Sequence, residues 1–256
     1  ERVRHPGLRE KIMSAEQAAE FVQNGMNVGI SGFTGAGYPK AVPAALAKRM
    51  EEAHARGEPF GIGMLTGAST AAECDGVLAR AKGVTMRTPF QSDADLRKNI
   101  NAGEVNYIDV HLSHLAQQAT FGFFGDMHMA IVEVAGILPD GRLIPSTSIG
   151  TNNAWLHNAD KIILEVNSRQ NILLEGMHDV YDHVGAPPNR KPIPLTSAGD
   201  RIGSPYMTCD LNKVVAVVLT DSADRNSKFA DPDANSKRIA SQIIDFFQHE
   251  VKMGRM

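Results

Sequence analysis

Short apolar runs alternate with longer segments of helical periodicity along most of the chain. Several of the apolar runs, such as "VVAVVLT" at 214–220, are apolar at consecutive positions, which is typical of strands buried on both faces. Alternating strands and helices indicate a parallel sheet with crossover helices. We therefore predict an α/β fold with an open, mostly parallel sheet flanked by helices. The predicted strands cover 26–31, 61–66, 84–86, 106–110, 127–134, 143–144, 161–167 and 213–220.

Helical periodicity predicts long helices at 14–24, 39–55 and 233–252, and shorter helices at 72–81, 93–100 and 152–158. Ser14, followed three residues later by Gln17, has the form of a capping box and predicts the start of the first helix. Between 167 and 210 the periodicity is lost, and we expect a long irregular segment that serves or covers a site. Four prolines interrupt this segment: Pro187, Pro188, Pro192 and Pro194.

Composition narrows the class of protein. The 256 residues, 43% of them hydrophobic, suffice for one α/β domain. A net charge of −3 without a clustered basic face argues against binding of nucleic acid. The longest aliphatic run is far shorter than the ~18 residues of a membrane span, so we expect no membrane insertion. Cys74 and Cys209 form no paired motif, which favours a reducing cytoplasm.

A glycine-rich segment separates the first predicted strand from the helix at 39–55, whose first turn suits Pro39. Ligands of open α/β sheets bind at the carboxyl ends of strands, where glycines let the backbone approach closely. The segment has neither the Walker A pattern nor the dinucleotide-binding order of glycines, so spacing alone leaves a ligand site and a tight turn equally open. The candidate residues are Gly32, Phe33, Thr34, Gly35, Ala36, Gly37 and Tyr38.

A second candidate segment, "PSTSIGTNN" at 145–153, offers the hydroxyl groups of Ser146, Thr147 and Ser148 before a predicted helix. Polar capping of that helix is the alternative explanation. A third and weaker candidate precedes the helix at 93–100 and consists of Phe90, Gln91 and Ser92.

Several segments resemble the acetyl-CoA hydrolase/transferase family, in the same order along nearly the whole chain. They include "SGFTGAGYPKAVPAALAKR" at 31–49, "TGAST" at 66–70, "MRTPFQSDADLRKNINAGEVNYIDVHLS" at 86–113, "IPSTSIGTNN" at 144–153 and "ADRN" at 223–226. The resemblance implies the fold of CoA-transferases and of some sugar-phosphate isomerases. Family members are longer and have two similar α/β halves, with the active site between them. This chain resembles the first half only, with its core at about 10–230 and a final helix at about 233–252.

The resemblance also implies an activity for the full-length protein. It would move CoA between an acyl-CoA, such as acetyl-, succinyl- or propionyl-CoA, and a small carboxylate such as acetate. A glutamate of the C-terminal half would form a glutamyl-CoA intermediate, so CoA is a substrate and no separate cofactor is required. This chain then holds no catalytic nucleophile and is inactive alone, and we expect it to bind the C-terminal half and to form a homo-oligomer. Residues 32–38 would face the thioester, with backbone N–H groups available to negative charge.

Other polar residues give no comparable signal. Four glutamates lack a placed partner and are interpreted as exposed or helix-capping acids: Glu104, Glu133, Glu165 and Glu175. Two sets of residues resemble metal sites but lack a further ligand at a fitting separation, so we predict no metal. They are Asp109, His111 and His114, and His178, Asp179, Asp182 and His183.

Three alternatives to CoA transfer remain open. Acetyl-CoA hydrolysis differs from transfer only in letting water reach the acyl-enzyme. A non-catalytic binding or regulatory subunit would never meet a catalytic half. A sugar-phosphate isomerase on the related fold is the third, although fold alone does not fix function. If the chain is half of a protein, we also expect an exposed apolar patch that drives association.

Overall fold

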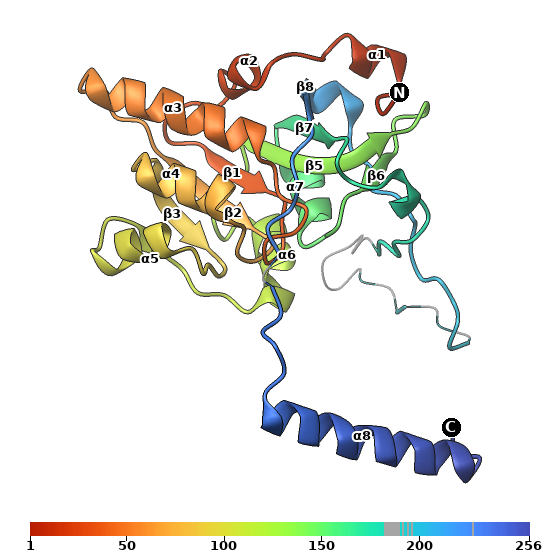
Figure 1. The fold of residues 1–256 in the computed structure, drawn as a ribbon. Helices are drawn as coiled ribbons and strands as arrows, with labels where there is room; N and C mark the ends of the chain where they lie inside the picture. The colour runs from red at the N-terminus through yellow and green to blue at the C-terminus, as the bar shows by residue number, and fades with distance from the viewer. Residues whose placement is uncertain (182–189, 191, 194, 196, 227) are drawn as a thin grey trace. The chain divides into compact units, whose positions relative to one another are not determined.

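The computed structural model describes residues 1–181, 190, 192–193, 195, 197–226 and 228–256. Two compact units make up the chain. The unit Glu1–Arg225 contains the sheet, and the unit Asn226–Met256 contains helix α8 (Ala234–Lys252; Figure 1). None of the helices formed by the described residues is both long and apolar enough to cross a membrane.

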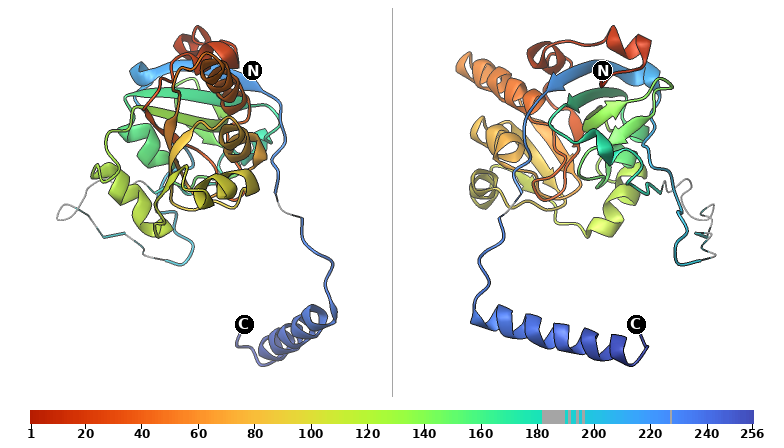
Figure 2. Two further views of the ribbon diagram at one scale, coloured as in Figure 1. Left: turned by 90° about the vertical axis from the view of Figure 1, so that its left-hand side faces the viewer. Right: turned by 45° about the vertical axis from the view of Figure 1, so that its right-hand side comes forward.

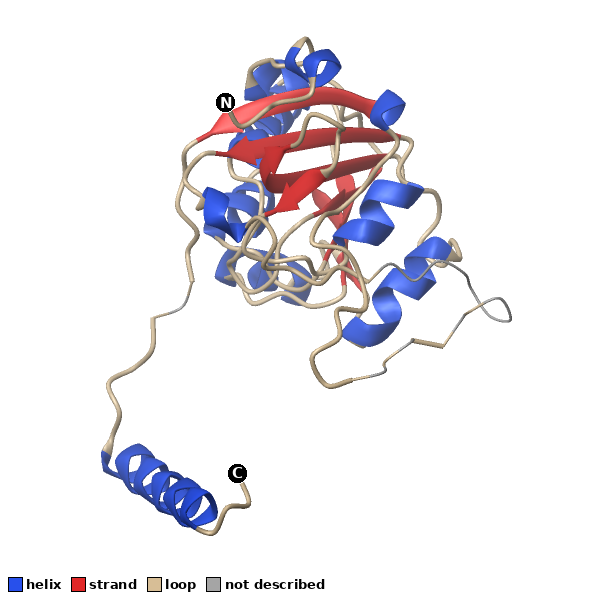
Figure 3. Cartoon of the chain, turned by 90° about the vertical axis from the view of Figure 1, so that its right-hand side faces the viewer, coloured by secondary structure: helices blue, strands red, loops and turns tan. Residues whose placement is uncertain are grey.

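The described residues of the larger unit form one eight-stranded sheet, which appears as a single layer in Figure 3. The strand order is β4-β3-β2-β1-β5-β7-β8, all neighbours on this path are parallel, and β6 pairs with β5 antiparallel. The open, mostly parallel α/β sheet predicted from the sequence is therefore confirmed. The strands are β1 (Asn27–Ile30), β2 (Ile62–Thr66), β3 (Val84–Thr88), β4 (Asn106–Tyr107), β5 (Met129–Ile137), β6 (Leu143–Pro145), β7 (Lys161–Asn167) and β8 (Val214–Thr220).

Helices cover both faces of this sheet (Figures 1 and 2). In β5, Ile131 packs in one apolar cluster with the first set of helices, whereas its neighbour Ala130 packs in a second cluster with the other set. One face carries α2 (Ala15–Ala19), α3 (Ala41–Ala55), η1 (Ala72–Gly76), α4 (Val77–Arg80) and α5 (Ala94–Asn101). The other carries α1 (Pro6–Arg9), α6 (Leu112–Thr120) and α7 (Asn152–Asn158). Burial of both strand faces accounts for the continuous apolar runs.

The helices predicted at 14–24 and 39–55 have different bounds in the structure. The capping box of Ser14 and Gln17 forms as predicted, but α2 ends at Ala19 instead of residue 24. Tighter i to i+3 bonds replace the helix there, and the Arg49 guanidinium binds the carbonyls of Ala19 and Val22.

Helix α3 begins at Ala41, so the prediction that Pro39 lies in its first turn is wrong. Lys40 caps the helix with a non-helical φ of −122°, and Pro39 precedes it. Pro43 occupies the first turn instead, where its missing N–H is not needed.

Helix α6 was not predicted, and the expected strand at 106–110 ends at Tyr107. The described residues between β7 and β8 are irregular as expected, with short 3-10 turns η2 (Ile172–Leu174) and η3 (Leu211–Lys213). Three of its four prolines, Pro187, Pro188 and Pro194, lie outside the described residues.

Candidate functional site

The carboxyl ends of β1 and β5 form the point where the strand order reverses. From β1 the chain proceeds to β2, β3 and β4 on one side, and it returns to β5 on the other side of β1. Open α/β sheets bind ligands in the crevice at such a point. The candidate glycine loop, residues 32–38, follows β1 at this position. The fold thus places it where a ligand of this architecture binds.

The tip of the glycine loop is a tight turn in a conformation that favours glycine. Phe33 and Ala36 exchange two backbone hydrogen bonds of 2.9 and 3.1 Å, which leaves Thr34 and Gly35 as the two turn residues. Their φ values are 48° and 78°, as a type I′ turn requires. Such a backbone costs a non-glycine residue about 1–2 kcal/mol, and strained positions cluster at functional sites.

The backbone amides of this loop are not all free for a ligand. Those of Phe33 and Ala36 bond to each other's carbonyls, and that of Gly37 donates to the carboxylate of Asp224 at 3.3 Å. The backbone N–H groups of the two tip residues, Thr34 and Gly35, have no acceptor among the described residues. The expectation from the sequence that the loop offers its N–H groups to negative charge therefore does not hold for Phe33, Ala36 and Gly37, whose N–H groups already have acceptors.

The serine loop, residues 146–148, lies directly against the base of the glycine loop. Ser148 Oγ donates to the Ala36 carbonyl at 2.9 Å across 112 residues of sequence. A Cβ atom on Gly37 would lie 2.5 Å from Ser148 Oγ and 2.7 Å from Ser146 Oγ, so only glycine permits this contact. The Ser146 hydroxyl is fully buried and has no hydrogen-bond partner among the described residues. The glycine loop and the serine loop, predicted independently of each other from the sequence, are therefore in direct contact.

A buried lysine cluster, consisting of Lys40, Glu133 and Asp224, underlies both loops. Lys40 Nζ lies 2.6 Å from Glu133 Oε2 and 2.9 Å from Asp224 Oδ1. The side-chain amides of Asn167 and Gln170 donate to Glu133 at 2.9 and 2.8 Å. Buried charges in proteins require such partners, and each charge here has them.

Burial and pairing shift the proton affinities of the lysine cluster in different directions. Burial raises the pKa of Glu133 to about 7, although Lys40 and two amides oppose the rise. Burial alone would raise the pKa of Asp224, but donation from Thr147, Lys40 and Gln170 lowers it overall. Burial alone would lower the pKa of Lys40, but Glu133 and Asp224 raise it overall. Lys40 and Asp224 are therefore charged at neutral pH, while burial makes Glu133 bind its proton more tightly than an exposed glutamate does.

Glu165 of β7 caps helix α3. Its fully buried carboxylate accepts from the backbone N–H of Lys40 at 2.6 Å, of Val42 at 3.0 Å and of Ala41 at 3.1 Å. A negative charge at this position also interacts favourably with the helix dipole. The interpretation of Glu165 as a helix-capping acid is confirmed, and its carboxylate is fully engaged.

The other three glutamates are engaged as well. Glu104 pairs with Lys82 on the surface, and Glu175 accepts from Tyr206 at 3.0 Å and from Arg4 at 3.3 Å. Glu133, however, is neither exposed nor a helix cap, so the interpretation of that residue from the sequence is wrong. The apolar run around it predicts burial, but its partners Lys40 and Asn167 come from distant segments.

The third candidate segment joins the same region. The backbone N–H of Ser92 donates to Ser69 Oγ at 2.9 Å, which ties the loop after β3 to the loop after β2. Gly67 of the latter loop lies so close to Gly32 that a Cβ atom there would be 2.8 Å from the Gly32 carbonyl oxygen. Phe90 is exposed, and Gln91 is buried. Loops after β1, β2, β3 and β6 therefore converge at one edge of the sheet.

The histidine sets that resemble metal sites lie elsewhere or serve other contacts. The rings of His111 and His114 are 5.4 Å apart, and His111 Nδ1 lies 2.8 Å from Ser113 Oγ. His178 Nε2 bonds to the Ser146 carbonyl at 2.8 Å, whereas Asp182 and His183 lie outside the described residues. Within the described part of the chain, no three His, Cys, Asp or Glu residues are grouped to hold a metal ion.

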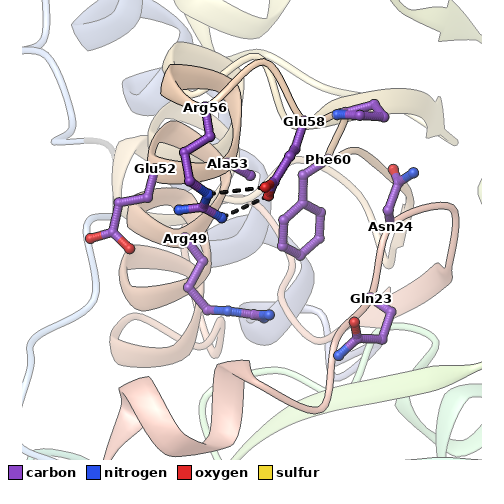
Figure 4. Close-up of a pocket in the computed structure, with 9 residues that line it drawn as sticks. Gln23, Asn24, Arg49, Glu52, Ala53, Arg56, Glu58 and Phe60 are labelled. Atoms are coloured by element: carbon purple, nitrogen blue, oxygen red, sulfur yellow. Dashed lines mark hydrogen bonds and ion pairs between the residues drawn. The ribbon is translucent and has the colours of Figure 1, made fainter.

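Two cavities of the described residues differ in their relation to this edge. One of about 260 Å³ lies before β1 and β2, at the opposite edge of the sheet (Figure 4). Within it Arg56 pairs with Glu58 at 2.8 Å, and the Arg49 guanidinium lies over the Phe60 ring. A larger cavity of about 730 Å³ lies between α6 and α7 and reaches Gly150 beside the serine loop. Only the larger one adjoins the converging loops.

Local sequence patterns predict both loops but not Lys40, Asp224 or Gln170. A lysine next to a helix start and an aspartate after the last strand carry no local pattern of their own. Asp224 does lie in the "ADRN" segment, so the resemblance already pointed to its vicinity. Asp224 contacts Lys40 and Gln170 only in the folded chain, and its bond to Gly37 crosses 187 residues, which periodicity does not reveal.

Comparison with known proteins places this geometry in a family. Residues 1–219 match the acetyl-CoA hydrolase/transferase N-terminal domain. The chain is 42% identical over 255 residues to succinyl-CoA:acetate CoA-transferase of Clostridium kluyveri, covering all of the chain and 47% of that protein. It is 35% identical over 262 residues to acetyl-CoA hydrolase of Schizosaccharomyces pombe, covering all of the chain and 50% of that protein. The chain thus spans about half the length of these curated relatives.

A solved structure supports the fold independently of close sequence similarity. Glutaconate CoA-transferase from Acidaminococcus fermentans matches with a TM-score of 0.53 at 14% identity, over 82% of this chain and 76% of that one. With the family match over most of the chain, the resemblance found in the sequence is confirmed. The chain belongs to the acetyl-CoA hydrolase/transferase family, to whose N-terminal domain its residues 1–219 correspond.

Proposed function

We propose that this chain forms the first half of a cytoplasmic, homo-oligomeric acyl-CoA:carboxylate CoA-transferase. The carrying observation is the 42% identity to a succinyl-CoA:acetate CoA-transferase over the whole chain, which spans 47% of that relative. The donors proposed are acetyl-, succinyl- or propionyl-CoA, and the acceptor is a small carboxylate such as acetate. CoA is a substrate in this scheme, and no further cofactor is required. The two unpaired cysteines, Cys74 and Cys209, agree with a reducing compartment.

In this proposal a second α/β half supplies the attacking glutamate. Its carboxylate attacks the thioester carbonyl, the carbon–sulfur bond breaks, and CoA leaves as a thiolate. The thiolate then attacks the glutamyl carbonyl of the resulting anhydride, and the free acid departs. The covalent route conserves the thioester energy that attack by water would lose. Support for a nucleophile outside this chain comes from Glu133 and Glu165, whose carboxylates are buried and already occupied.

The glycine loop would form the wall of the reacting pocket. The free amides of Thr34 and Gly35 are donors suited to the carboxylate acceptor or to the oxyanion formed during attack. The serine loop contacts the base of this loop, and Asp224 of the lysine cluster accepts hydrogen bonds from both loops. All of these groups lie at the switch point of the sheet.

Acetyl-CoA hydrolysis is the second candidate, and the 35% identity to acetyl-CoA hydrolase of Schizosaccharomyces pombe favours it. The two activities differ in whether water or a carboxylate resolves the acyl-enzyme. Release of CoA from acetyl-CoA should depend on added acetate or succinate for a transferase. Equal release without any acceptor acid would favour the hydrolase.

The test of the glycine loop uses the complete two-half protein of this proposal. Gly35→Val forces a β-branched residue to a φ of 78° and should lower kcat at least tenfold. Gly57→Val is the matched control, because Gly57 has a φ of 75° and lies after α3 with no atom within 4 Å of its added Cβ. Both variants carry the same backbone strain, but only the first should lose activity.

Unchanged turnover of Gly35→Val would remove the loop from the active site. The placement of the nucleophile is tested separately by incubating the 256-residue chain with acyl-CoA and measuring its intact mass. We expect no covalent acyl or CoA adduct on this chain alone. An adduct on one of its own side chains would contradict the proposal. Purification of the natural protein without any glutamate-bearing second half would favour a non-catalytic subunit instead.

A further inference from the structure

Asp224 is the common hydrogen-bond acceptor of several loops at the carboxyl edge. It follows β8, and its side chain is only 8% exposed. Its carboxylate accepts from the Gly37 backbone N–H at 3.3 Å, from Gln170 Nε2 at 3.0 Å and from the Thr147 hydroxyl. Lys40 Nζ lies 2.9 Å away. Segments following β1, β6 and β7 are thus bound to one side chain.

The charge of Lys40 does not by itself require Asp224. Glu133 lies closer to Lys40 Nζ, at 2.6 Å, and supplies a buried carboxylate for that ammonium group. What Asp224 adds is a connection between the glycine loop, through Gly37, and the serine loop, through Thr147. The Glu133 carboxylate accepts from Lys40, Asn167 and Gln170, none of which belongs to either loop. It therefore does not replace this connection.

Only an ionised carboxylate satisfies this arrangement of donors. Both oxygens of Asp224 face N–H or O–H groups, and a carboxylate can accept at both. An asparagine would turn its NH2 group either toward Lys40 or toward Thr147 and Gln170. One side would then oppose a donor to a donor, which leaves buried groups unpaired. Hydrogen bonds to a charged acceptor are also stronger than neutral ones.

From this geometry we propose that Asp224 is a positioning residue of the site. It fixes the base of the glycine loop against the serine loop, and it thereby sets the position of the Thr34–Gly35 tip. It does not itself touch the reacting atoms. The consequence for catalysis rests on the proposed function, whereas the consequence for loop order does not.

Loop order is tested on the 256-residue chain by amide hydrogen exchange followed by NMR. In Asp224→Asn we expect the Gly37 amide to exchange at least tenfold faster. The amide of Ser31, which bonds to the Ile131 carbonyl inside the sheet, should keep its rate. Asp221→Asn is the matched control, because Asp221 is exposed, directly follows β8 and lies three residues before Asp224. An unchanged rate at Gly37 in the Asp224 variant would overturn the proposal.

The catalytic consequence is tested in the complete protein. Asp224→Asn should lower kcat at least tenfold and leave KM for acyl-CoA within about twofold, because the loop tip is proposed to face the thioester. Asp221→Asn should keep both values. A wild-type kcat in Asp224→Asn would overturn the positioning role. A tenfold loss of kcat/KM that came only from a raised KM would overturn it as well.

Two further observations keep the outcomes distinct. If the wild-type complete protein transfers no CoA, the proposed function fails, and the exchange rate at Gly37 still decides the role of Asp224. If Asp224→Asn does not fold, Thr147→Val removes one donor and keeps every charge. That variant should raise the Gly37 exchange rate and lower kcat in the same direction by a smaller factor, and no change in either value would overturn the proposal.

Discussion

Glu133 is a carboxyl group enclosed within β5 beside one lysine, and its proton affinity differs between the folded and unfolded chain. Burial raises its pKa from 4.5 to about 7. The folded protein therefore binds this proton more tightly than the unfolded chain does. The resulting stabilisation is fully present below the unfolded pKa and is lost as the pH rises through about 7.

Glu133→Gln removes this titration, because an amide does not ionise. The free energy of unfolding of the variant, relative to the wild type, should therefore increase by about 2 kcal/mol between about pH 5 and about pH 8. Urea unfolding of the 256-residue chain across this range measures the difference. A constant difference for Glu133→Gln would contradict the raised pKa.

The left-handed backbone conformation of Thr34 is not predictable from its residue type. Threonine is common in strands, and nothing in the sequence marks position 34 as left-handed. The tight turn between Phe33 and Ala36 imposes the φ of 48°. Strain of this kind persists only where the surrounding structure determines it, which agrees with the contacts at the base of the loop.

At the level of elements, the start of α3 depends on a residue in another strand. Glu165→Gln should lower the free energy of unfolding by about 2 kcal/mol, because its NH2 group would face one of the three backbone N–H donors that the carboxylate now accepts. Denaturant unfolding measures this loss. Asp233→Asn at the exposed cap of α8 is the matched control. Asparagine is an equally good N-cap there, so the control should unfold at the wild-type midpoint.

Dependence on distant residues explains why the ends of some elements were predicted correctly and those of others were not. Strand β7 and helix α7 match expectation at both ends, because their apolar runs and flanking residues are local signals. Helix α3 was placed two residues early, since its cap comes from Glu165, 125 residues away from Lys40. Helix α2 was predicted too long, because the Arg49 guanidinium takes the carbonyls that would continue it.

In the candidate site, too, local patterns predict some features and miss others. Glycines after a strand and hydroxyls before a helix are local patterns, so the glycine loop and the serine loop were both predicted. Their direct contact was not, because it crosses 112 residues. Asp224 connects them across a still longer separation and has no local pattern at all. Local patterns therefore yielded the parts of this site, and the long-range contacts that assemble it required the structure.

At the scale of the whole molecule, the smaller unit presents an apolar surface that its own residues do not cover. Helix α8 has no buried residue. Apolar side chains recur along it at helical spacing and lie 45–61% exposed: Ile239, Ile243, Ile244, Phe246, Phe247 and Val251. This helix lies beyond the matched N-terminal domain, which ends at residue 219, while the curated relatives align over the whole chain. Its apolar stripe is suited to packing against a further surface.

This stripe predicts how the 256-residue chain behaves alone. Burial of one such side chain contributes about 1.5–3 kcal/mol, so several together favour association of copies through α8. Sedimentation should show a mass that increases with protein concentration, and Ile243→Lys should weaken that dependence because a charge in the stripe opposes burial. Lys237→Glu, on a charged position of the same helix, is the control and should associate as the wild type does. A concentration-independent monomer would mean that the stripe is not an association surface, and it would remove one reason to expect a second half.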